Sequence, residues 1–152
     1  MTIDTDIIAP WEQTKWITLS SMFFIIPATY AFFNNIYYHS SLLFITSAVS
    51  ANYWREAKPS WRRDLDFTVA KISVITGVST GIIYLRSPFY LTIFATGLAG
   101  LSYCYYLSNR LHAIKNPNWW KYHVAFHVLL TCEQFLVFHN MIMSRQIPQN
   151  RI

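Results

Sequence analysis

Apolar residues in this chain are gathered into five long blocks, separated by short stretches that carry most of the charges. The blocks cover residues 16–33, 37–54, 65–85, 88–107 and 119–143. Each block approaches the roughly 20 residues that a helix needs to cross the hydrocarbon core of a bilayer. The pattern therefore predicts an all-α fold, a polytopic transmembrane helical bundle of about five spans that forms a single domain over residues 1–152.

The five blocks differ in how clearly they indicate a membrane span. The first, third and fourth are the most apolar, whereas the second is short and rich in serine and the fifth carries polar side chains. Pro27 lies inside the first block, where it is expected to disturb the helix. The composition agrees with a membrane location, because only 12% of the residues are charged, against about 25% in an ordinary soluble domain.

The basic residues predict how the bundle is oriented. Eight fall on the side of the N-terminus, namely Lys15, Arg55, Lys58, Arg62, Arg63, Arg110, Lys115 and Lys121, and three on the other side, namely Arg86, Arg145 and Arg151. Because basic loops stay on the cytoplasmic side of membranes, we expect the N-terminus on the cytoplasm-like side and the C-terminus opposite. All six tryptophans lie near the basic side, as in an interfacial belt.

Small residues recur at every fourth position in two of the blocks. They are Ser73, Gly77 and Gly81 in the third block, and Thr92, Thr96, Gly100 and Cys104 in the fourth. In lipid, small residues allow helix backbones to approach closely, which replaces the hydrophobic drive that folds soluble proteins. We therefore expect the third and fourth blocks to pack against each other.

Polar residues from three blocks are expected to meet near the basic side of the membrane. His123 and His127 stand four residues apart and so share one face of a helix. Ser50 and Asp66 lie at a similar depth in the second and third blocks. Zinc needs a third protein ligand beside the two histidines, and Asp66 is the best candidate. Without a metal, the same side chains would form a buried hydrogen-bonded cluster.

Three further polar residues lie within the apolar blocks. Lys71 is predicted to extend its ammonium group towards the basic side. Glu133 is expected to be a buried acid, protonated or hydrogen-bonded to another helix, and Gln134 shares the helical stripe of His127. Charged groups in hydrocarbon are expensive, so each of them requires a partner or a function.

The order of a serine near the end of one block, an aspartate at the start of the next and HxxxH in the last resembles the CREST superfamily, which includes alkaline ceramidases and progestin and adipoQ receptors. The resemblance implies a zinc site near one membrane face, with His123 and His127 as ligands and with Ser50 and Asp66 at the reaction centre. Two features depart from the family pattern. The chain has five blocks instead of seven, and Trp54 occupies the position of the remaining ligand histidine.

Three functions are compatible with these features. The preferred one is a non-catalytic subunit or accessory helical bundle of a larger membrane complex. The first alternative is a zinc-dependent hydrolase of a lipid amide or ester, and the second is a transporter or proton path through Asp66, Lys71 and Glu133. The net charge of +5 is spread over several loops, so the expected partners are anionic lipids and other membrane subunits, and not nucleic acid.

Overall fold

The computed structural model describes residues 8–146, and this part of the chain is entirely helical apart from short connections. Its elements are α1 (Trp11–Ser21), the 3-10 turn η1 (Met22–Phe24), α2 (Ile25–Phe33), α3 (Tyr37–Trp54), α4 (Trp61–Tyr84), α5 (Pro88–Ala113) and α6 (Trp119–Gln146). Because α1, η1 and α2 follow one another without a break, the elements form five helical rods. The prediction of an all-helical bundle is confirmed.

The 3-10 turn in the first rod is explained by Pro27. A proline inside a helix has no backbone N–H to donate, and its ring crowds the carbonyl four residues earlier, which here belongs to Phe23. The chain tightens into a 3-10 turn over Met22–Phe24 just before the proline and then resumes as α2. The expected disturbance at Pro27 is therefore a local change of helix type, and the rod continues through it.

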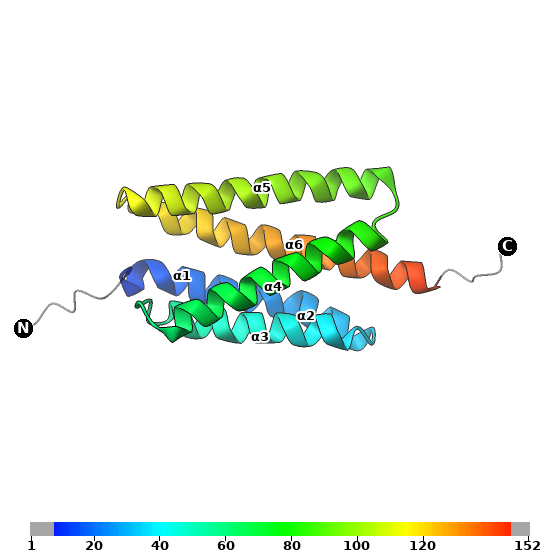
Figure 1. The fold of residues 1–152 in the computed structure, drawn as a ribbon, viewed down its shortest axis with the longest axis horizontal. Helices are drawn as coiled ribbons and strands as arrows, with labels where there is room; N and C mark the ends of the chain where they lie inside the picture. The colour runs from blue at the N-terminus through cyan, green and yellow to red at the C-terminus, as the bar shows by residue number, and fades with distance from the viewer. Residues whose placement is uncertain (1–7, 147–152) are drawn as a thin grey trace, which may run out of the picture.

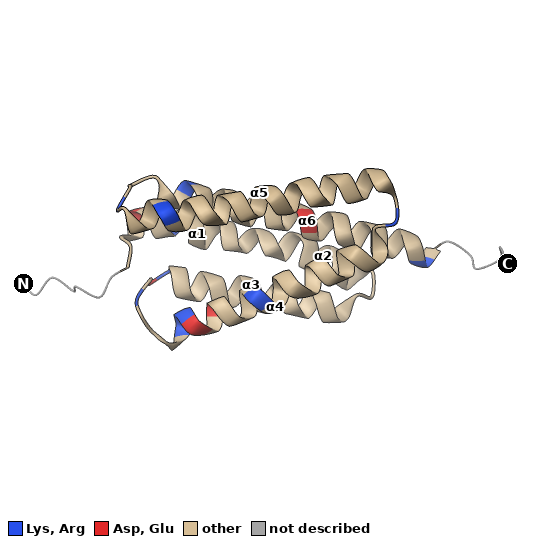
Figure 2. Ribbon diagram, turned by 45° about the horizontal axis from the view of Figure 1, so that its top comes forward, with Lys and Arg blue, Asp and Glu red and all other residues tan. Residues whose placement is uncertain are grey.

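The five rods run back and forth along the long axis, so all connections lie at two ends of the molecule (Figure 1). We call the end that holds the connections 55–60 and 114–118 the basic end, and the end that holds the connections 34–36 and 85–87 the opposite end. Figure 2 shows that most charged residues gather at the basic end, with few along the rods. Helix α5 packs mainly on α6, while α3 contacts α1, α2 and α4.

The predicted packing of the third and fourth blocks against each other is wrong. Helices α4 and α5 start next to each other at the turn 85–87 and then diverge towards the basic end, as both ribbon views show (Figures 1 and 2). Within the described part of the chain, α4 packs on α3 and less extensively on α6, whereas α5 packs on α6. Helix α6 therefore lies between the two groups of helices and connects them.

The small residues of α4 and α5 make room for large side chains, and this explains the error. Gly77 faces the Gln134 side chain of α6, and Gly81 faces the Phe94 ring of α5. Gly97 faces Glu133 in the same way, and Gly100 faces Leu129. Two further residues of the predicted packing face act through their hydroxyls. Ser73 Oγ lies 2.6 Å from Thr46 Oγ of α3, and the exposed Thr96 donates to the Thr92 carbonyl of its own helix.

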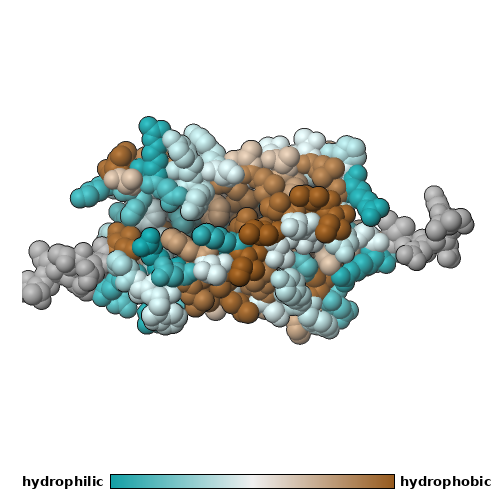
Figure 3. Space-filling view, viewed as in Figure 1, coloured by the Kyte–Doolittle hydropathy of each residue, from teal (hydrophilic) through white to brown (hydrophobic). Residues whose placement is uncertain are grey.

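Two of the five rods, Trp11–Phe33 and Trp61–Tyr84, are long and apolar enough to cross a membrane by themselves. Among the described residues, the other three rods do not reach the same apolar content. Figure 3 shows hydrophobic side chains gathered over the middle of one face, with hydrophilic side chains towards both ends. The expectation of a membrane protein is therefore supported in its coarse form.

Candidate functional site

The two histidines of α6 lie in the interior of the bundle and contact serines from two other helices. Nδ1 of the buried His127 lies 2.8 Å from Oγ of Ser20 in α1. Nδ1 of His123 lies 3.3 Å from Oγ of Ser108 in α5. The two imidazole rings are also in contact, with their centroids 4.9 Å apart. The four side chains thus form one polar line across α1, α6 and α5.

Asp66 belongs to a second polar group, which adjoins the first at the neighbouring residues Ser20 and Ser21 of α1. It is buried against α3, where its carboxyl is hydrogen-bonded to the side chain of Ser50. Ser21 Oγ of α1 donates to Ser50 Oγ over 3.1 Å, and Ser47 Oγ donates to the Ser21 carbonyl over 2.9 Å. Three helices are therefore linked through small hydroxyl side chains around one carboxyl group.

The prediction that Asp66 is the partner of His123 and His127 is wrong. Within residues 8–146, the hydrogen-bond partners of the histidines are serines of α1 and α5, and that of Asp66 is a serine of α3. The described chain likewise contains no group of three His, Cys, Asp or Glu side chains placed to hold a metal ion. The physical reason is helix placement: α6 directs its histidines between α1 and α5, whereas α4 directs Asp66 towards α3.

Trp54 occupies the position that the CREST resemblance assigns to a ligand histidine, and here it packs on His123 and Trp119. Its ring centroid is 4.7 Å from that of His123 and 5.9 Å from that of Trp119. The side chain is buried, and its indole Nε1 has no hydrogen-bond partner in the described part of the chain. The residue thus contributes an apolar surface and one unused donor, and no metal ligand.

The remaining polar candidates within the helices do not form a connected path. Glu133 is buried over Gly97, and its Oε2 has no hydrogen-bond partner among residues 8–146. Gln134 is buried against Gly77 on the neighbouring face of α6. Lys71 is exposed on α4. Since Asp66 is held by Ser50 near the basic end and Glu133 lies in the middle of α6, no chain of described hydrogen bonds joins the three charged groups.

A pocket that sequence analysis did not predict lies at the basic end, where α4 and α5 diverge. Its volume is about 370 Å³. It is lined by Arg63 and Phe67 of α4, by Tyr105, Ser108, Asn109 and His112 of α5, and by Tyr53, Trp54, Trp119 and His123 of α3 and α6, together with Ile8 and Pro59. The lining is mostly aromatic, it contains one permanent cation, and it contains no carboxylate. In the sequence, only the many aromatic residues near the basic ends of the apolar blocks could have indicated this pocket.

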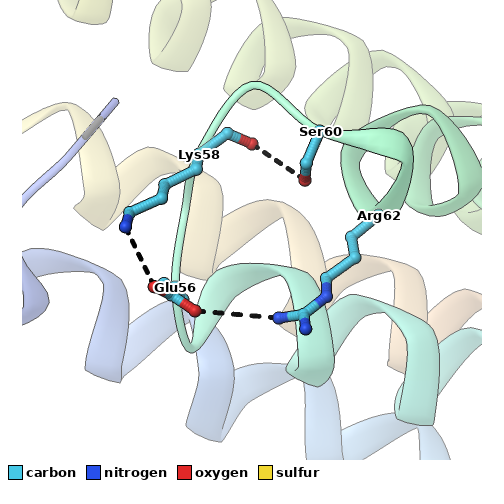
Figure 4. Close-up of polar contacts among 4 residues, drawn as sticks. All are labelled: Glu56, Lys58, Ser60 and Arg62. Carbon is cyan, nitrogen blue, oxygen red and sulfur yellow. Dashed lines mark hydrogen bonds and ion pairs between the residues drawn. The ribbon is translucent and has the colours of Figure 1, made fainter. Parts of the chain in front are cut away.

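The connection between α3 and α4 contributes Pro59 to the pocket lining and is held by contacts among four of its neighbouring residues, which Figure 4 shows. Glu56 pairs with Lys58 at 3.0 Å and with Arg62 at 3.8 Å, and Ser60 Oγ donates to the Lys58 carbonyl. The hydrogen bond from the Lys58 ammonium group lowers the pKa of Glu56 below its ordinary value. Glu56 therefore neutralises part of the charge of Lys58 and Arg62, while neighbouring Arg63 has no carboxylate partner in the described chain.

Comparison with known proteins adds no further information about this site. No protein-family model, no curated protein and no solved structure matches the chain. The resemblance to the CREST superfamily is neither supported nor opposed by these comparisons.

Proposed function

We propose that this chain is a multi-pass membrane protein in which all five rods cross the bilayer, with the basic end on the cytoplasm-like side. The observation that carries this proposal is the apolar surface of the rods between the two charged ends. On α4 and α5, the exposed fractions of Ile75, Ile82 and Phe89 are 66%, 69% and 68%. A soluble monomer rarely exposes a continuous apolar surface of this kind, whereas hydrocarbon tails would cover it without cost.

The direction of the polar side chains also supports the proposal that the less apolar rods cross the bilayer. In α3, Ser40, Ser47 and Ser50 are buried, and in α6 so are Glu133 and Gln134. These residues lower the mean hydropathy of their helices, but they face other helices and not the surroundings. Polar residues inside membranes are arranged in this way, because a polar group facing hydrocarbon is costly.

We propose further that the bundle acts as a non-catalytic accessory subunit of a larger membrane complex. The support is that its internal hydroxyl and imidazole groups link helices to one another: Ser20 with His127, Ser21 with Ser50, and Thr46 with Ser73. Such contacts fix helix positions and leave the aromatic outer surface free to contact neighbouring subunits.

Extraction and native electrophoresis test this function. The protein should remain in membranes washed at alkaline pH, and after mild detergent extraction it should migrate with other proteins in an assembly far larger than its own 17.8 kDa. Release by the alkaline wash would contradict the membrane location. Migration as a monomer, with no copurifying membrane protein, would contradict the role as a subunit.

A lipid hydrolase is the second candidate, and one contact at the pocket favours it. Ser108 Oγ lies 3.3 Å from His123 Nδ1, and both residues line the pocket. A histidine that accepts the proton of a serine hydroxyl can activate it for attack on an ester or amide carbonyl. A fluorophosphonate probe distinguishes the two functions, because labelling that is lost in a Ser108→Ala variant would favour the hydrolase, and the accessory subunit should not be labelled.

A further inference from the structure

The pocket at the basic end has the chemistry of a binding site for an anionic membrane lipid, and we propose that it holds the phosphate headgroup of such a lipid. This inference rests on the proposed membrane location and adds a ligand to it. The pocket lies beside the tryptophans and basic loops, which mark the level of lipid headgroups in membrane proteins. A lipid in that leaflet would reach the pocket sideways, between the diverging helices α4 and α5.

Arg63 is the residue that gives the pocket its preference for an anion. Its guanidinium group lies over the Phe67 ring, with its carbon 5.3 Å from the ring centroid. It makes no ion pair within the described chain, whereas neighbouring Arg62 is paired with Glu56. Since no carboxylate lines the pocket, the charge of Arg63 is not neutralised there. A guanidinium group in this state can bind a phosphate through two parallel hydrogen bonds.

Two further donors are unused beside Arg63. The indole N–H of Trp54 is buried without an acceptor, which costs free energy that a bound acceptor would recover. The Asn109 side chain lines the same pocket and makes no hydrogen bond with the described residues. Several hydrogen-bond donors without acceptors thus lie around one aromatic pocket. This arrangement favours binding of a ligand that supplies the acceptors.

The size and lining of the pocket favour a lipid over a free anion. A volume of about 370 Å³ falls at the lower end of the range for small-molecule sites, and it exceeds what a phosphate group alone would occupy. Phe67 of α4 and Tyr105 of α5 both line the pocket and are exposed, so they can contact the glycerol and the first methylenes of an acyl chain. The rest of the chain would lie outside the pocket, along the apolar surface between α4 and α5.

The test uses the full-length protein in nanodiscs of phosphatidylcholine with or without phosphatidic acid, and counts retained lipids by native mass spectrometry. We expect one phosphatidic acid per protein, with affinity reduced about tenfold by Arg63→Gln, the loss of roughly one charge-assisted hydrogen bond. Arg62→Gln is the matched control, because it removes the same charge one residue away but outside the pocket. Arg63→Lys should retain part of the affinity, since it keeps the charge and loses the planar pair of donors.

Three outcomes would overturn the proposal. Equal losses in the Arg62 and Arg63 variants would mean that the whole basic end attracts anionic lipid without a specific site. Equal retention of phosphatidylcholine would remove the headgroup preference, and displacement of the lipid by inorganic phosphate at similar concentration would assign the pocket to a free anion. Failure of the protein to enter nanodiscs would instead contradict the proposed membrane location, so the two failures are distinguishable.

Discussion

The two ends of the bundle are built from different kinds of contact. At the opposite end, Val137, Phe138, Met141 and Ile142 of α6 pack into a continuous apolar core with residues of α2, α3, α4 and α5. At the basic end, the same helix carries His123 and His127, which meet serines and tryptophans beside a pocket. The comparison indicates that apolar packing dominates at the opposite end, whereas the basic end combines a smaller apolar cluster with hydrogen-bonded polar side chains and a pocket.

The largest effect is expected from a substitution in the apolar core of the opposite end. Phe138 is fully buried there, so Phe138→Ala should leave a cavity and reduce the free energy of unfolding by about 3–5 kcal/mol. Thermal unfolding in detergent measures the loss. Phe89→Ala is the control, because Phe89 is mostly exposed. Equal melting temperatures for the two variants would contradict the description of the opposite end as the principal core.

A smaller effect is expected between the two ends, where α5 lies on α6. A Cβ atom at Gly97 would collide with the carboxyl group of Glu133, whereas one at Gly100 would make an ordinary contact at 3.5 Å with Leu129. Both Gly97→Ala and Gly100→Ala gain the roughly 1 kcal/mol by which alanine favours a helix over glycine. Gly97→Ala must also displace the Glu133 side chain, so it should leave the bundle about 2 kcal/mol less stable than Gly100→Ala does. Similar thermal stability of both variants would show that Glu133 is not held in the groove over Gly97.

The smallest of these stability effects is expected at the basic end. Ser20→Ala would leave Nδ1 of the buried His127 without its partner and should cost about 1 kcal/mol. Ser102→Ala serves as the control, because the Ser102 hydroxyl is exposed and bonds only within its own helix. A loss as large as that of Phe138→Ala would mean that the polar line is a main source of stability, and the contrast between the ends would disappear.

The helices could be predicted from the sequence because apolar blocks of this length favour a helix. The predicted block 37–54 coincides with α3, whereas α1 begins at Trp11 and α5 continues to Ala113, beyond the predicted blocks. The extra turns carry interfacial and polar residues such as Ser108 and Asn109. Because these residues are not apolar, the apolar pattern does not predict that they belong to the helix, although Ser108 and Asn109 continue α5 and line the pocket.

The candidate site was predictable only in part, because a helical stripe does not identify the helix that it faces. The four-residue spacing correctly places His127 in the interior, but the depth and the helical face of Asp66, on which its pairing with the histidines is predicted, do not identify the helix that it contacts. Ser20 was missed as a partner, since a serine in an apolar block has no distinguishing pattern. The pocket depends on how far α4 and α5 diverge, and the sequence does not show which large side chains pack on the glycines of these helices, as Gln134, Glu133 and Phe94 do.

The central claim is that the two ends lie on opposite sides of a membrane, and labelling of single cysteines tests it most directly. In a background without Cys104 and Cys132, the Ser60→Cys variant places a thiol at the basic end and the Ser87→Cys variant places one at the opposite end. We predict that a membrane-impermeant maleimide labels the Ser87→Cys variant in intact cells, and labels the Ser60→Cys variant only after permeabilisation. Labelling of both variants in intact cells would contradict the account.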